Sequence, residues 1–74
     1  MELTAAQIGM SYLDAAKKAD SLIKECTRQL KEATRNHDYK KCMHLKRERL
    51  VLYSEKRDLL EIGYKLIHYY EKEN

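Results

Sequence analysis

The sequence predicts an all-α fold, an antiparallel two-helix hairpin, and three observations point to it. The 74 residues contain no proline and two glycines, which disfavours turn-rich β architectures. Good helix formers dominate the chain: alanine, leucine, lysine, glutamate, arginine and methionine. The single cluster of turn-prone residues is Asn36-His37-Asp38, so we expect one turn between two long helices in a single domain, residues 1–74.

The first helix is expected over residues 5–35. Thr4 and Gln7 form a capping-box pattern, in which each side chain satisfies a free backbone amide of the other residue. Apolar or small residues then recur with the 3–4 alternation that is typical of a helix–helix seam. They are Ile8, Tyr12, Ala15, Ala19, Leu22, Cys26, Leu30 and Ala33.

The second helix is expected over residues 39–71. Asn36 tolerates the left-handed conformation that closes a helix, and Asp38 can cap the helix that follows. A connection this short makes the two helices antiparallel. The predicted seam of the second helix is Tyr39, Met43, Lys46, Leu50, Tyr53, Arg57, Leu60, Tyr64 and Ile67.

A hairpin that turns at Asn36 also predicts a register between the two seams. Gly9 comes level with Gly63, and large residues face small ones at two levels, Ala19 with Tyr53 and Ala33 with Tyr39. Two cations fit less well, because Lys46 lies opposite Cys26 and Arg57 opposite Ala15; their charged ends must reach water. The facing pairs are Ile8 with Tyr64, Tyr12 with Leu60, Ala19 with Tyr53, Leu22 with Leu50 and Ala33 with Tyr39.

A row of leucines on the second helix adds a second apolar stripe, with Leu45, Leu52, Leu59 and Leu66 recurring every seven residues. The combined apolar arc is wider than one partner helix can cover. We expect a second copy to cover it, which gives a homodimer built as a four-helix bundle. The predicted protein interface is Leu45, Leu52, Leu59, Leu66, Tyr64 and Tyr70. A three-helix monomer with a broken first helix and a different protein partner are the alternatives.

Positive charge concentrates near the turn. The chain has 15 Lys and Arg against 12 Asp and Glu, and the excess lies between Arg35 and Arg49. Candidate contacts for an anion or a nucleic-acid backbone are Lys40, Lys41, Lys46, Arg47 and Arg49. A solvated basic face and a contact with an acidic protein are the other interpretations.

No catalytic, cofactor-binding or metal-ligating constellation stands out. Cys26, His37, Cys42 and His44 match no common zinc spacing, and Cys42 and His44 would point to different sides of a helix. The cysteines are expected to be small buried residues. The chain has no glycine-rich phosphate loop and no serine–histidine–acid pattern, so we expect neither an enzyme nor a bound cofactor or metal.

The expected location is the cytoplasm, without membrane contact. No apolar run approaches the ~18 residues of a membrane span. The N-terminus has no basic segment followed by an apolar one, and two cysteines are too few for a disulfide framework.

Residues 31–49, Lys31-Glu-Ala-Thr-Arg-Asn-His-Asp-Tyr-Lys-Lys-Cys-Met-His-Leu-Lys-Arg-Glu-Arg49, resemble the UVR motif, a short helical hairpin of bacterial excision-repair subunits and some chaperone–protease adaptors. Asp38-Tyr39 resembles the acidic–aromatic pair of that motif. Cys42-Met43 stand where two alanines are usual, and Leu45-Lys46-Arg47 stand where Leu-Arg-Asp is usual, which reverses a charge. The resemblance implies a protein–protein docking hairpin, often dimeric and without catalysis.

Taken together, the patterns predict a small, non-catalytic interaction or adaptor module that self-associates. The alternative is a nucleic-acid-binding accessory protein that uses the basic segment 35–49. Such binding would be weak and sensitive to salt, because the chain has no element that would read bases.

Overall fold

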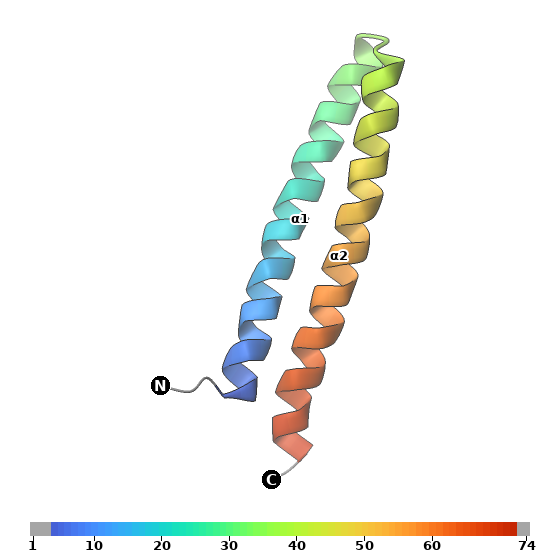
Figure 1. The fold of residues 1–74 in the computed structure, drawn as a ribbon. Coiled ribbons are helices and arrows are strands. Elements are labelled where there is room, and N and C mark those ends of the chain that lie inside the picture. The colour runs from blue at the N-terminus through green and yellow to red at the C-terminus, as the bar shows by residue number, and fades with distance from the viewer. Residues whose placement is uncertain (1–3, 73–74) are drawn as a thin grey trace.

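The computed structural model describes the backbone of residues 4–72 and the side chains of residues 4–69. It contains two α-helices, α1 (Ala5–Arg35) and α2 (Tyr39–Lys72). They run antiparallel and are joined by a short turn at one end (Figure 1). The predicted all-α hairpin is confirmed, and α2 ends one residue beyond its predicted boundary.

The start of α1 follows directly from its sequence. The Gln7 amide donates to Thr4 Oγ1 at 3.1 Å, and the Thr4 amide donates to Gln7 Oε1 at 2.9 Å. Two of the amides that a helix start leaves unpaired are therefore satisfied by side chains. The predicted capping box is present with both of its hydrogen bonds.

The turn closes α1 in a slightly different way from the prediction. Asn36 has φ −88° and ψ 2°, and His37 takes the left-handed conformation, with φ 57°. The His37 amide donates to the Thr34 carbonyl at 3.1 Å, and the Asp38 amide donates to the Ala33 carbonyl at 2.9 Å. This is the Schellman arrangement, which places the left-handed residue one position after the helix cap. Asp38 caps α2 as expected, since its Oδ1 accepts from the Lys41 amide at 3.2 Å.

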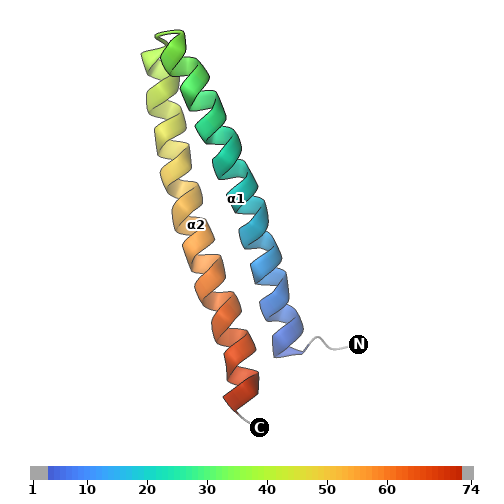
Figure 2. The same cartoon turned by 180° about the vertical axis from the view of Figure 1, so that it is seen from behind.

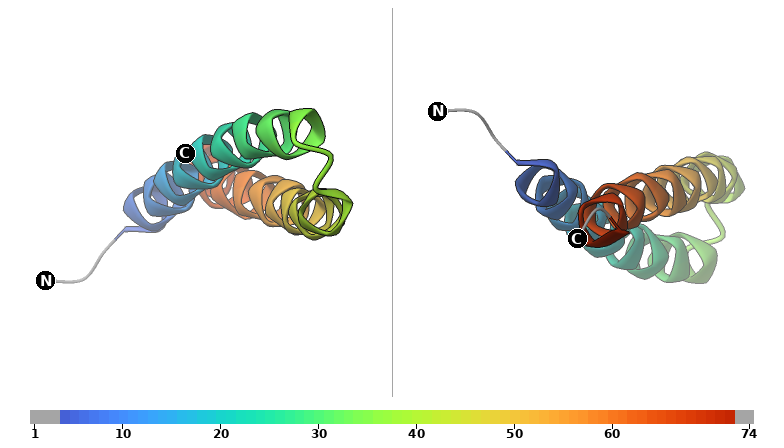
Figure 3. Two further views of the ribbon diagram at one scale, coloured as in Figure 1. Left: turned by 90° about the horizontal axis from the view of Figure 1, so that it is seen from above. Right: turned by 90° about the horizontal axis from the view of Figure 1, so that it is seen from below.

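The hairpin is a thin rod. Its Cα atoms extend over 56 × 20 × 14 Å, with a radius of gyration of 16.7 Å. The turn lies at one end of the rod. The start of α1 and the end of α2 lie at the other, which we call the open end (Figures 1 and 2). Viewed along the rod, the two helices are inclined to each other rather than strictly parallel (Figure 3).

The seam between the helices differs from the predicted one on both helices. On α1 the predicted seam residues Ile8 and Leu22 are exposed, at 37% and 55%. Leu45 is buried at 4% exposure, and Leu52, Leu59 and Leu66 are half-buried in the same row. Small residues of α1 line the other side of the seam: Gly9, Ala16, Ala19 and Ala33, together with Ile23. The predicted seam of α2 was wrong, because its large members are exposed to solvent: Tyr39, Met43, Leu50, Tyr53 and Tyr64.

Two cations explain why the leucine row faces α1. Each apolar stripe of α2 contains two basic residues, Arg49 and Lys56 in the leucine row and Lys46 and Arg57 in the other. In the structure, α1 supplies an acceptor for each cation of the leucine row. Arg49 Nη1 donates to Thr27 Oγ1 at 3.4 Å, and Lys56 Nζ donates to Asp20 Oδ1 at 2.8 Å. A half-buried charge without a partner loses solvation free energy. Packing the leucine row against α1 therefore costs less free energy than packing the other stripe there would.

The predicted contact between the two glycines is present, but the register is shifted along the rod, since a Cβ on Gly9 would also lie 2.8 Å from Ile67 Cγ1 and one on Gly63 2.9 Å from Leu13 Cδ2. A Cβ placed on Gly9 would lie 2.8 Å from the Gly63 carbonyl oxygen, so these glycines meet as predicted. Farther along the rod, Asp20 meets Lys56, and the Thr34 hydroxyl meets the Cys42 thiol at 3.6 Å. These partners lie about one helical turn further along α2 than the predicted register places them.

Candidate interaction surfaces

The predicted leucine interface lies inside the hairpin. Within one chain Leu45 is buried and Leu52, Leu59 and Leu66 are half-buried in the seam, so Leu45 is not available to a second copy and the other three are available only in part. Tyr64 is exposed, as expected of an interface residue, and its ring stacks near His68 with centroids 6.3 Å apart. The side chain of Tyr70 lies outside the described residues.

The outward apolar stripe of α2 consists of the residues that the sequence pattern assigned to the seam. We call it the tyrosine stripe. Leu50 is 70% exposed and Tyr39 73% exposed, and Met43, Tyr53 and Tyr64 have more than half of their surface in solvent. Leu60 and Ile67 are half-buried at its inner edge. The stripe consists of Tyr39, Met43, Lys46, Leu50, Tyr53, Arg57, Leu60, Tyr64 and Ile67.

The tyrosine stripe lies beside a row of lysines on α1. Lys17 lines a shallow groove together with Leu60 and Tyr64. Lys24 and Lys31 follow at intervals of seven residues, which places all three on one side of α1. The sequence signal for this row was its seven-residue spacing, and our interpretation of the sequence did not use it.

Asp20 is the carboxylate at this edge of the seam. Its Oδ1 accepts from Lys56 Nζ at 2.8 Å, and its Oδ2 lies 3.4 Å from Lys24 Nζ. These contacts, first the hydrogen bond from Lys56, hold the pKa of Asp20 below its ordinary value. The carboxylate therefore stays charged but is occupied within the chain, and the tyrosine stripe with its lysine row has an excess of positive charge.

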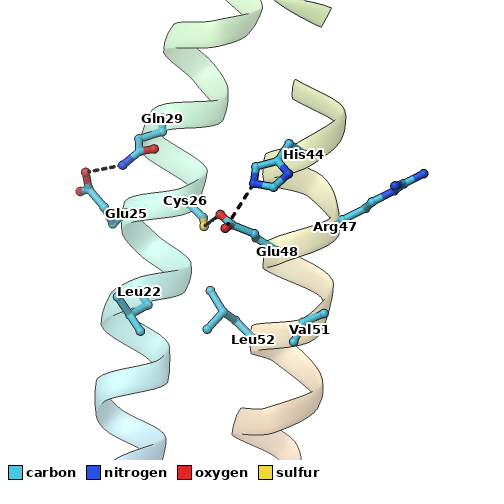
Figure 4. Close-up of a pocket in the computed structure, with 9 residues that line it drawn as sticks. All are labelled: Leu22, Glu25, Cys26, Gln29, His44, Arg47, Glu48, Val51 and Leu52. Carbon is cyan, nitrogen blue, oxygen red and sulfur yellow. Dashed lines mark hydrogen bonds and ion pairs between the residues drawn. The ribbon is translucent and has the colours of Figure 1, made fainter. Parts of the chain in front are cut away.

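The opposite flank of the seam holds a groove of about 680 Å³, which we call the glutamate groove (Figure 4). Leu22 and Val51, exposed at 55% and 57%, give it apolar walls. Glu25 comes from α1 and Glu48 from α2, while Arg47 extends away from the helix pair (Figure 4). The lining residues are Leu22, Glu25, Cys26, Gln29, His44, Arg47, Glu48, Val51 and Leu52.

Hydrogen bonds hold one carboxylate of the glutamate groove, Glu25, in its ionised form. Arg28 and Gln29 donate to Glu25 and lower its pKa to about 2, with the Arg28 hydrogen bond as the larger cause. Glu48 Oε2 accepts from the Cys26 thiol at 3.9 Å, and its Oε1 lies 3.5 Å from His44 Nε2. Burial, and then the charge of Glu48, raise the pKa of Cys26, so its thiol stays protonated and is a poor nucleophile.

The basic residues near the turn do not share one face. Lys46 belongs to the tyrosine stripe, Arg47 borders the glutamate groove, and Arg49 is half-buried against Thr27. Lys40 and Lys41 are exposed, and successive helical residues point about 100° apart. The structure therefore does not gather the predicted anion-binding residues Lys40, Lys41, Lys46, Arg47 and Arg49 into one patch.

The cysteines and histidines are also dispersed. Cys42 is buried, Cys26 is half-buried, and both are free thiols. His37 is exposed at the turn, and His44 is exposed beside Glu48. Among the side chains that the structure describes, no three His, Cys, Asp or Glu residues gather as ligands of a metal ion would.

Comparison with known proteins adds no assignment: no family model matches the sequence, and neither the curated proteins nor the solved structures give a significant match. Over residues 4–72, neither helix is both long enough and apolar enough to cross a bilayer. The two flanks of the hairpin are therefore its candidate interaction surfaces.

Proposed function

We propose that this hairpin is a non-catalytic protein–protein interaction or adaptor module, which works in the cytoplasm as a homodimer. The second copy docks on the tyrosine stripe, and the pair forms a four-helix bundle. The resemblance of residues 31–49 to UVR-motif hairpins agrees with a docking role. Two free cysteines agree with a reducing compartment.

The observation that carries the proposal is the exposed tyrosine stripe. Its apolar side chains stay in solvent although the seam between the helices is already closed. Tyrosine and methionine are enriched in protein interfaces, because they bury large surfaces and adapt to a partner. A continuous row of such residues on the outside of a monomer is typical of an interaction site.

The exposed area is large enough for a stable partner. The chain exposes 6200 Å², whereas a compact monomer of its mass exposes about 4,800 Å². The excess, about 1,400 Å² per chain, exceeds the roughly 800 Å² that each partner buries in an interface of standard size. A second copy supplies a surface of the same length, and four-helix bundles are the usual form in which two hairpins pair.

Sedimentation equilibrium of the pure protein tests the proposal. We expect dimers at tens of micromolar, and a thermal midpoint that rises with protein concentration, because association stabilises the folded state. Leu50→Asp puts a charge at the centre of the stripe without entering the seam, and should give monomers that keep their helical circular dichroism.

Ser54→Asp is the matched control, since it places the same charge on α2 at an exposed position outside the stripe. This variant should remain dimeric. A wild-type protein that stays monomeric at several hundred micromolar would remove the proposed function.

Nucleic-acid binding has weaker support. Lys40, Lys41, Lys46, Arg47 and Arg49 point in different directions, so a phosphate backbone would meet only some of them at once. An electrophoretic shift assay at low and at physiological salt tests this alternative, and no shift at low salt would eliminate it.

A further inference from the structure

We infer that the second copy docks by its other flank, so that the tyrosine stripe of one chain packs on the glutamate groove of the next. This inference rests on the proposed self-association and specifies its geometry. The contact is head-to-tail, because two different surfaces of the same chain meet.

The charges of the two flanks are complementary. Lys17, Lys24 and Lys31 lie along the tyrosine stripe, and Lys46 and Arg57 lie within it. Asp20, on the same flank, is already bonded to Lys56 and Lys24. Basic side chains therefore outnumber acidic ones on this flank, and its net charge is positive.

The carboxylates of the glutamate groove outnumber the arginines beside them, which are Arg47 in its lining and Arg28, paired with Glu25 and Glu32. Glu25 lines the groove from α1 and Glu48 lines it from α2. Glu32 follows Glu25 by seven residues, and Glu55 follows Glu48 by seven residues. The lysine row has the same seven-residue spacing, so both sets of charges repeat with the same period along the rod. Charges placed in this way fix the orientation of a partner and exclude wrong pairings.

Apolar surface is available on both flanks to provide the affinity. Leu22 and Val51 stand more than half exposed at the glutamate groove, and Leu50 and Tyr53 do so on the tyrosine stripe. A stripe-on-stripe dimer would bring the lysine rows of two chains together, and a groove-on-groove dimer would bring the glutamates together. Pairing of stripe with groove avoids both repulsions.

Head-to-tail contact has a consequence for size. A dimer formed in this way leaves one tyrosine stripe and one glutamate groove unoccupied at its ends, so it can add further copies. At protein concentrations well above the tens of micromolar at which dimers form, average mass should therefore rise further. The Kd of the wild-type protein should increase several-fold when sodium chloride is raised from low to high concentration, because salt screens the charges.

Two neighbouring positions give a matched test. Leu50→Asp damages the tyrosine stripe and Val51→Asp damages the glutamate groove, with the same new side chain one residue apart. Each variant alone should be monomeric where the wild type associates. An equimolar mixture should form 1:1 complexes, because it contains one intact stripe and one intact groove. Circular dichroism checks that both variants remain helical, and Glu48→Lys is a second groove variant.

The outcomes separate this inference from the proposed function. In one outcome, Leu50→Asp is monomeric while Val51→Asp and Glu48→Lys still associate. This result would mean that the dimers pair stripe on stripe, and it would overturn the head-to-tail contact but not the proposed function. A mixture that stays monomeric, or a Kd that does not rise with salt, would also overturn it. A monomeric wild type would remove the proposed function itself.

Discussion

Gly9 and Gly63 meet across the seam at the open end of the rod. A Cβ on Gly9 would lie 2.8 Å from the Gly63 carbonyl oxygen and 2.8 Å from Ile67 Cγ1. A Cβ on Gly63 would lie 2.9 Å from Leu13 Cδ2, the end of a flexible side chain, and 3.0 Å from the Gly9 carbonyl oxygen. Both glycines therefore meet backbone, and the backbone contact is the closer one at Gly9.

Gly9→Ala should destabilise the hairpin by about 1–2 kcal/mol. Overpacking costs about 1–3 kcal/mol, and the better helix propensity of alanine returns up to about 1 kcal/mol. Urea denaturation followed by circular dichroism measures the difference. Gly63→Ala should cost less because Leu13 can rotate, and a Gly9→Ala variant as stable as the wild type would mean that the backbones do not meet here.

Asp20 should make the hairpin sensitive to acid. Lys56 and Lys24 depress its pKa in the folded state from the ordinary 3.8. A depressed pKa stabilises the fold fully above that ordinary value, and the contribution is lost as pH falls through the lower folded value. Stability should therefore decrease as the solution is acidified from about pH 5 toward about pH 2.

Asp20→Asn is the comparison that isolates this effect. The amide cannot ionise, so the variant should be less stable than the wild type near neutral pH and the gap should narrow in acid. Denaturation curves at several pH values measure it, with Asp14→Asn as an exposed control on the same helix. A gap that is independent of pH would contradict the role of the Asp20 charge.

At the scale of elements, the turn is built on one residue in an unfavourable conformation. His37 has φ 57°, and it alone among the described non-glycine residues has a positive φ. Left-handed backbone costs a residue with a Cβ about 1–2 kcal/mol. The Schellman hydrogen bonds to Ala33 and Thr34 hold His37 there.

His37→Gly should stabilise the hairpin by about 0.5–1 kcal/mol, because glycine enters the left-handed region without strain but loses more entropy on folding. Thermal or urea denaturation measures the change. Asn36→Gly is the control: Asn36 has φ −88°, so glycine gains nothing there and should destabilise. Equal effects at both positions would contradict the assignment of the strain to His37.

The elements themselves could be predicted from the sequence, whereas their packing could not. Thr4, Gln7 and Asp38 are local signals, and they gave the helix boundaries within one residue. The second helix carries two apolar stripes with the same seven-residue period, so the period does not show which of them packs against α1. The choice depends on partners across the seam for Arg49 and Lys56, which only the register reveals. Because the leucine row forms the seam, the four leucines of the predicted interface lie within the hairpin, whereas Tyr64 stays exposed.

The whole molecule has one interface between two helices and therefore cannot surround its apolar residues. A compact domain of this length has a radius of gyration of about 11 Å, whereas this rod measures 16.7 Å. Each helix is covered on one side, and the two remaining flanks differ in charge. These flanks are the surfaces that an elongated shape leaves exposed.

A cluster of buried residues, Ala33, Cys42 and Leu45, lies next to the turn. Contacts there close the shortest loops of chain, and every contact nearer the open end closes a longer one at a higher entropic cost. The rod should therefore unzip from the open end while the layers beside the turn stay paired. Slow amide hydrogen exchange should be concentrated around that cluster and should fade toward Gly9 and Gly63, so that the hairpin can fray in part without unfolding as a whole.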